Sequence, residues 1–102
     1  MSFLPLDGPA VQTKISVTTS TVVEMKADTN ILEDRKVITF QPLLYYIYVY
    51  WGDEDVVPNS TTVSENGFEY PPGLYTIEVG NRQHVYMLAK TSTTNVVLVE
   101  RG

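Results

Sequence analysis

Hydrophobic and polar residues alternate in short runs along most of the chain, and this period of two is typical of half-buried β-strands. No window shows the apolar spacing of an amphipathic helix, so we expect no helix longer than about two turns. The runs recur every 8–12 residues or so, roughly the spacing of a sandwich or small barrel. Predicted strands cover 15–17, 23–25, 36–41, 43–51, 56–57, 75–79, 85–89 and 96–99.

Turn-forming residues separate these runs. Asp and Asn in 27–30 can bond their own backbone, which favours a turn there. Asn66-Gly67 predicts a β-hairpin, because both residues tolerate a positive φ. Pro71-Pro72-Gly73 predicts a type II turn with a positive φ at Gly73. Together with the strands, these turns predict a single antiparallel β-sandwich of seven or eight short strands, jelly-roll-like or immunoglobulin-like.

The alternation also predicts which side chains form the core between the two sheets. Replacing a central member of this set with Ala would cost roughly 2–5 kcal/mol. We expect ten residues to be mostly buried: Ile15, Val17, Ile38, Phe40, Ile47, Val49, Ile77, Val79, Met87 and Val97.

The run 43–51 differs from the others because both of its faces carry large apolar bodies. One face contains Ile47 and Val49, and the other contains Leu44, Tyr46, Tyr48 and Tyr50. The tyrosines can pack under a long loop or beneath the N-terminal segment. Alternatively, since Tyr is enriched at interfaces, another copy of the protein or a partner covers them. We expect the second arrangement, with a homodimer as the first choice and a trimer as the second.

Residues 1–13 precede the alternation and form a different kind of segment. Two prolines, Pro5 and Pro9, exclude a central strand and favour extended or turning backbone. The segment is either a loose end or an arm whose apolar side chains, Phe3, Leu4 and Leu6, dock on a neighbouring subunit. We therefore predict an N-terminal arm over 1–13 and a sandwich domain over 14–102.

Composition supports the β assignment and excludes several functions. Val and Thr supply 26 of the 102 residues, and seven Tyr add to them. The net charge of −5 argues against nucleic acid or an anionic membrane as partners. The absence of cysteine excludes disulfides, thiolate metal sites and cysteine nucleophiles. The first residues do not resemble a signal peptide, and no apolar run is long enough to span a bilayer.

Few residues offer catalytic chemistry. His84 is the only histidine, no Ser stands in a recognisable nucleophile motif, and we expect His84 to be an ordinary surface residue. Asp53-Glu54-Asp55 could hold Ca²⁺, but adjacent side chains on an extended chain diverge, so a solvated loop is favoured. Asn59-Ser60-Thr61 matches a glycosylation triplet that often arises by chance. We expect no enzyme, no cofactor and no metal.

The order of the segments resembles small β-sandwich virion proteins of tailed bacteriophages, over residues 14–101. In that family a Thr-rich strand, an Arg-led strand and an aromatic strand ending in Gly follow one another. An Asn-Gly hairpin, a Pro-Gly turn and a closing strand ending in Glu complete the order. The matching segments here are 15–21, 35–41, 46–52, 66–73, 85–89 and 96–100. The sequence departs from the family after Gly52, where an acidic insert replaces a short Val-Thr-Thr loop.

This resemblance implies a structural virion protein, of the capsid decoration or cement type, that binds and stabilises the assembled head. It implies the major capsid protein as a partner and a location on the capsid exterior, after synthesis in the host cytoplasm. Two alternatives stay open. One is a head-tail connector, collar or head-fibre-base protein, and the other is a carbohydrate- or protein-binding β-sandwich module.

Overall fold

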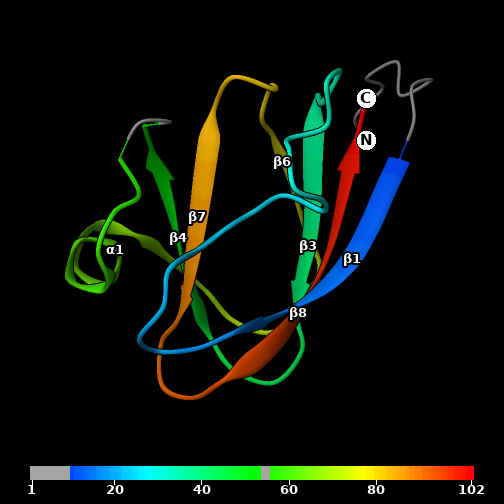
Figure 1. Cartoon of the computed structure of the whole chain (residues 1–102). Coiled ribbons are helices and arrows are strands. Elements are labelled where there is room, and N and C mark those ends of the chain that lie inside the picture. Colours follow the sequence, from blue (N-terminus) through cyan, green and yellow to red (C-terminus); the bar gives the residue numbers. More distant parts are fainter. Residues whose placement is uncertain (1–9, 54–55) are drawn as a thin grey trace.

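Figure 1 shows the computed structural model, which describes residues 10–53 and 56–102. In that part of the chain there are eight strands and one helix. Their bounds are β1 Ala10–Val17, β2 Val23–Glu24, β3 Val37–Pro42, β4 Ile47–Gly52, α1 Ser60–Asn66, β5 Phe68–Tyr70, β6 Tyr75–Glu78, β7 His84–Ala89 and β8 Thr94–Arg101. Seven strands overlap runs that the alternation marked, whereas the strand Phe68–Tyr70 and the helix Ser60–Asn66 were not predicted. The predicted strand at 56–57 was wrong, because Val56 forms only an isolated bridge with Asp53.

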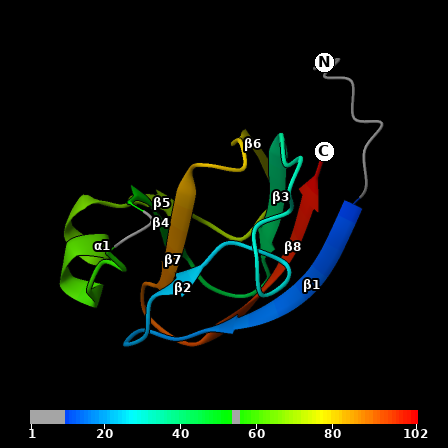
Figure 2. The same cartoon turned by 45° about the horizontal axis from the view of Figure 1, so that its top comes forward.

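The strands form two antiparallel four-stranded sheets, with orders β1-β8-β3-β6 and β2-β7-β4-β5. The strands pair from the two ends of the chain inward, first with last, as in a long hairpin ribbon. The pairs are β1 with β8, β2 with β7, β3 with β6 and β4 with β5. The β3–β8 and β4–β7 pairs then join these ribbons into sheets that face each other (Figure 2). A folded ribbon of eight strands is the jelly roll, so the topology decides between the two predicted sandwich types.

The core between the sheets contains most of the residues expected there. Seven of the ten are buried, namely Val17, Ile38, Phe40, Ile47, Val49, Val79 and Met87. Ile15 and Ile77 are partly buried and pack against this cluster. The prediction for Val97 was wrong, because Val96 and Leu98 point inward and are fully buried instead. The run Val96–Val99 is apolar throughout and offers no alternation from which to choose a face.

The predicted hairpin at Asn66-Gly67 was also wrong, because a helix of seven residues ends there. Asn59 starts this helix by accepting a hydrogen bond from the Thr62 amide (2.8 Å), which is the usual role of an N-cap. At the other end the Gly67 amide donates to the Val63 carbonyl at 2.8 Å. At Pro71–Gly73 the predicted positive φ is present, but its value of 157° at Gly73 is far from the roughly +80° of a type II turn, so that turn type is not formed.

Strand β1 begins at Ala10, inside the segment 1–13 that the sequence assigned to an arm. The two prolines that exclude a strand lie before this point, at 5 and 9. Phe3, Leu4 and Leu6 lie outside the described residues, and their docking on another subunit stays a prediction.

Candidate interaction surface

The β3–β4 loop, residues 43–46, carries four exposed apolar side chains. Leu44 is 69% exposed, and Leu43, Tyr45 and Tyr46 are between 39% and 46% exposed. The loop backbone is bonded to the sandwich, because the Leu43 amide donates to the Asn95 carbonyl (3.0 Å). The Leu44 amide donates to the hydroxyl of buried Thr94 at 3.1 Å. Since these amides point toward β8, the apolar side chains are left at the surface.

Three further loops meet at the same end of the sandwich, over residues 18–22, 71–74 and 90–93 (Figure 1). Backbone bonds hold two of the loops beside the end of β7, from the Ala89 amide to the Thr18 carbonyl and from the Lys90 amide to the Tyr46 carbonyl, both at 3.0 Å. Leu74 adds a further exposed side chain, at 70%. Loops 18–22 and 90–93 are mostly Thr and Ser, so the exposed apolar area lies in 43–46 and at Leu74. We call the four loops together the apolar end.

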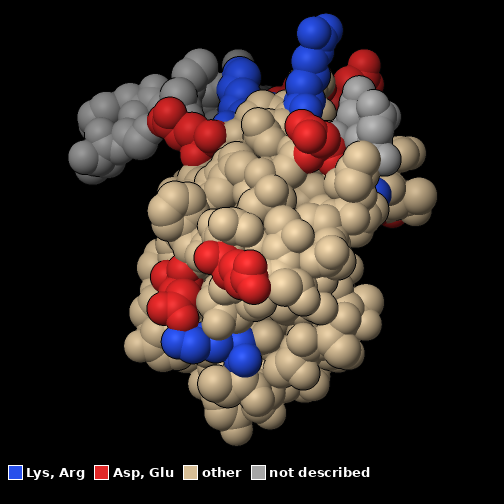
Figure 3. All heavy atoms as spheres, turned by 90° about the vertical axis from the view of Figure 1, so that its left-hand side faces the viewer, with Lys and Arg blue, Asp and Glu red and all other residues tan. Residues whose placement is uncertain are grey.

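Lys90 is the one charged residue in the four loops of the apolar end. Its amine forms an ion pair with Glu69 and lies 5.5 Å from the centre of the Tyr46 ring. The hydrogen bond to Glu69 raises the pKa of Lys90. Figure 3 shows that basic and acidic residues otherwise gather at the upper end and around the middle of this face, leaving its lower end uncharged.

Tyr48 and Tyr50 lie on the outer face of the sheet that contains β4, together with Leu88 and Tyr86 of β7, which face them in register. The chain's own helix α1 packs on β4 and β7, and its Val63 is fully buried. Tyr48 and Tyr50 are therefore half-buried beside α1. Leu44 and Tyr46, by contrast, belong to the exposed apolar end. The structure thus separates the four residues that the sequence placed on one contact face, and their role in an interface stays a prediction.

Tyr86 is buried within this outer layer and donates its hydroxyl hydrogen to the Asp53 carbonyl at 3.0 Å. Burial raises the pKa of Tyr86, and the charges of Glu24 and Asp53 raise it further. Gly52 makes room for the ring, because a Cβ at this position would lie 2.8 Å from the Tyr86 ring. Tyr86 is a structural group, since its hydroxyl already has a backbone partner.

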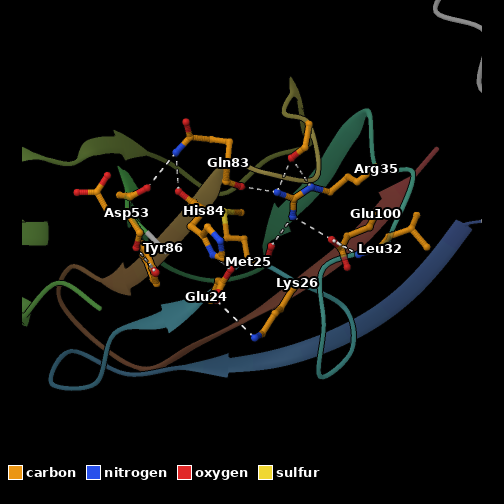
Figure 4. Close-up of polar contacts among 12 residues, drawn as sticks. Glu24, Met25, Lys26, Leu32, Arg35, Asp53, Gln83, His84, Tyr86 and Glu100 are labelled. Atoms are coloured by element: carbon orange, nitrogen blue, oxygen red, sulfur yellow. Dashed lines mark hydrogen bonds and ion pairs between the residues drawn. The ribbon is translucent and has the colours of Figure 1, made fainter. Parts of the chain in front are cut away.

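Arg35 and Glu100 form a buried ion pair, with charged atoms 2.9 Å apart (Figure 4). Their side chains are 0% and 1% exposed. Arg35 also donates to the carbonyls of Met25, Gly80 and Gln83 at 2.6–3.2 Å. Glu100 accepts hydrogen bonds from the amides of Ala27 (2.7 Å) and Leu32 (3.3 Å). The pair therefore ties loops 25–35 and 80–83 to β8.

The Arg35–Glu100 pair was not predicted from the sequence, although the sequence contains a signal for it. Glu100 continues the inward alternation of Val96 and Leu98, so an acidic residue falls on a core position. A buried carboxylate requires a cation, and Arg35 precedes the neighbouring strand β3. The signal is visible only once the inward face of β8 is known.

His84 was expected at the surface, and the structure corrects this. Its side chain is only 18% exposed, and its Nδ1 lies 2.7 Å from a carboxylate oxygen of Glu24, which also pairs with Lys26 at 3.5 Å (Figure 4). The expectation failed because β2 and β7 are neighbours only in the folded sheet, and their pairing places Glu24 beside β7.

Within residues 10–53 and 56–102, no cluster of three or more His, Asp or Glu side chains could hold a metal ion. Of the three carboxylates considered for Ca²⁺, Asp53 is exposed, and Glu54 and Asp55 lie outside the described residues. No helix in the described part of the chain is long and apolar enough to cross a membrane.

Comparison with known proteins finds no matching family model and no matching curated protein. Among solved structures, the chain is similar to hydroxypropylphosphonic acid epoxidase from S. wedmorenis, with a TM-score of 0.51 and 16% identity. The match covers 89% of this chain but only 43% of the epoxidase, so the chain spans less than half of that enzyme's length. A protein of disulfide-linked Bacillus endospore appendages also matches, with a TM-score of 0.48 and 16% identity, over 99% of this chain and 95% of the other. The similarity to the epoxidase shows the fold alone.

Proposed function

We propose that this chain is a non-catalytic structural protein of a bacteriophage particle, which binds the assembled head from outside as a decoration or cement protein. The observation that carries the proposal is the apolar end. Its exposed apolar side chains lie together, and the one charged residue in its loops, Lys90, is paired with Glu69. An exposed apolar patch of this kind is typical of a surface that a partner covers. The jelly roll is compatible with this role, since viral capsid proteins use the same architecture, although a fold alone does not determine function.

In this proposal the apolar end stands on the capsid lattice, and the charged loops at the other end face water. Contacts made only with assembled subunits stabilise the assembled shell by linkage, and many copies add their effects. The carbohydrate-binding alternative has less support. Trp51, the only tryptophan, packs on the core and against Phe68 with ring centres 5.8 Å apart, so it does not offer a free stacking surface.

The test compares Leu44→Asp with the control Val57→Asp in co-sedimentation with capsids, assembled from the coat protein encoded nearest to this chain. Both positions are exposed, at 69% and 65%, but Val57 lies outside the apolar end. We expect Leu44→Asp to weaken binding at least tenfold and Val57→Asp to bind like the unchanged protein. Equal binding of the two variants would exclude the apolar end as the contact. Equal binding of the unchanged protein to free coat subunits would exclude a cement role, and a few copies per particle would favour a connector or collar.

A further inference from the structure

The outer edge of β1 is unusual among the four sheet edges. The other edge strands, β2, β5 and β6, span only two, three and four residues, whereas β1 spans eight. Short edge strands protect a sheet from pairing with other chains, and β1 lacks that protection. Among the described residues, no strand pairs with β1 on the side away from β8 (Figures 1 and 2).

The register shows which backbone groups of β1 point toward this edge. The Leu43 amide bonds to the Asn95 carbonyl, so odd-numbered residues of β8 bond to β3 and even-numbered residues bond to β1. The residues opposite Val96, Leu98 and Glu100 are the odd-numbered ones of β1, at 11, 13 and 15. The N–H and C=O groups that point to the free edge therefore belong to the even-numbered residues, Ala10, Gln12, Lys14 and Ser16.

The side chains of β1 that face the core are incompletely covered. Val11, Thr13 and Ile15 are half-buried, whereas their inward-facing neighbours Val96 and Leu98 on β8 are fully buried. The difference arises because β8 has strands on both sides and β1 has one. A strand added beside β1 would pair its backbone groups and cover these three side chains.

We propose that this strand is β1 of a second copy, paired antiparallel about a two-fold axis beside Thr13. Gln12 of one copy then lies opposite Lys14 of the other, and Ala10 lies opposite Ser16. The four hydrogen-bonded pairs would supply about eight N–H···O bonds, two from each pair. Val11 of each copy would lie opposite Ile15 of the other, which gives a β-branched pair on each side of the axis.

Two features favour this register over shifted ones: the even numbering of the residues that face the edge, and the charge of Lys14. Only even-numbered residues present hydrogen-bonding groups at the edge, so an even-numbered residue must face an even-numbered one. Shifting the axis to Lys14 would place two like charges directly opposite each other, which is destabilising. Shifting it to Gln12 would leave Ser16 beyond the paired part of the strand. The proposal goes beyond the capsid role, because it concerns the free protein and leaves the apolar end uncovered.

Single cysteines test the register directly, because the chain has no native cysteine. In the proposed pairing the two copies of residue 13 form a non-hydrogen-bonded pair with Cα atoms about 4.5 Å apart, within disulfide range. The two copies of residue 12, or of residue 14, would be two residues out of step, about 6.8 Å along the strand and about 5 Å across it. Their Cα atoms would then lie roughly 8 Å apart, which is too far for a disulfide. We expect Thr13→Cys to form disulfide dimers under mild oxidation at least ten times faster than Gln12→Cys or Lys14→Cys. Equal rates would overturn the pairing, and a faster Gln12→Cys or Lys14→Cys would overturn the register.

A proline variant provides a second measurement without a covalent bond. Gln12→Pro removes an N–H that points to the free edge and spares the β1–β8 hydrogen bonds. We expect sedimentation equilibrium to show a dimer for the unchanged protein and for the control Gln12→Ala. The dissociation constant of Gln12→Pro should rise at least tenfold, with an unchanged far-UV circular dichroism spectrum. A monomeric unchanged protein at high micromolar concentration, or a Gln12→Pro dimer as tight as the control, would overturn the proposal whether or not capsids bind.

Discussion

The two ends of the sandwich distribute their polar groups differently. At one end, Arg35 and Glu100 are buried and bonded to the backbone of loops 25–35 and 80–83. At the apolar end, the loop 43–46 directs backbone amides toward β8 and leaves Leu43–Tyr46 exposed. In the first arrangement the charged groups of Arg35 and Glu100 bond to each other and to the loop backbone, so they are not available to a ligand. The second leaves apolar area that the folded monomer does not use, and this difference is why we assign binding to the apolar end.

The strongest test of this comparison removes the carboxylate of the buried pair. Glu100→Ala leaves the Arg35 guanidinium buried without its counter-charge and leaves two loop amides without an acceptor. We expect a loss of about 3–5 kcal/mol in the free energy of unfolding, measured in urea. Arg101→Ala, at the exposed neighbouring position, is the control and should change stability by less than about 0.5 kcal/mol. Equal effects of the two variants would show that the pair does not hold this end together.

Much of the fold could be predicted because period-two alternation reports local geometry. The strands around Ile38 and Ile47 follow from it, since each has a half-buried or exposed residue on at least one side of its core position. The failures occur where the local signal is ambiguous. Val96–Val99 has no alternation, and Asn66-Gly67 suits the end of a helix as well as a hairpin. In the second case Asn59 decided the outcome by capping the helix seven residues earlier.

The candidate surface could be predicted only in part, because it depends on contacts between distant segments. The sequence identified Leu44 and Tyr46, but it grouped them with Tyr48 and Tyr50 by strand periodicity. Helix α1 changes this grouping, since it packs beside the second pair and not over the first. The Glu24–His84 contact likewise joins residues 60 positions apart. Such pairings follow from the jelly-roll topology, which alternation does not specify.

A smaller effect is expected at Tyr86, whose hydroxyl bonds to the carbonyl of Asp53 at the end of the sandwich where Arg35 holds loop 80–83. Tyr86→Phe removes one hydrogen bond, and we expect it to cost about 1 kcal/mol near neutral pH. The pKa of Tyr86 is raised in the folded protein, so above its ordinary value the unfolded chain loses the proton first. Unfolding then releases a proton, and the stability of the unchanged protein falls as pH rises.

The measurement for Tyr86 is urea unfolding of both proteins at several pH values between neutral and strongly alkaline. The advantage of the unchanged protein over Tyr86→Phe should shrink once the pH exceeds the ordinary tyrosine pKa, because the variant lacks the titrating group. The other tyrosines titrate in both proteins and cancel in the difference. An advantage that stays constant or grows with pH would contradict the burial of this hydroxyl.

The smallest effect on stability is expected at the apolar end itself, and it separates a binding surface from a structural one. Leu44 is 69% exposed and Ile47, three residues later, is fully buried, so Leu44→Ala and Ile47→Ala form a matched pair of truncations. Ile47→Ala should cost about 2–5 kcal/mol, because it removes transfer free energy and leaves a cavity. Leu44→Ala should stay within about 0.5 kcal/mol in the same urea titration, because its side chain is already in water. A loss above about 1 kcal/mol for Leu44→Ala would mean that this loop supports the fold, and the reason for assigning its apolar area to a partner would disappear.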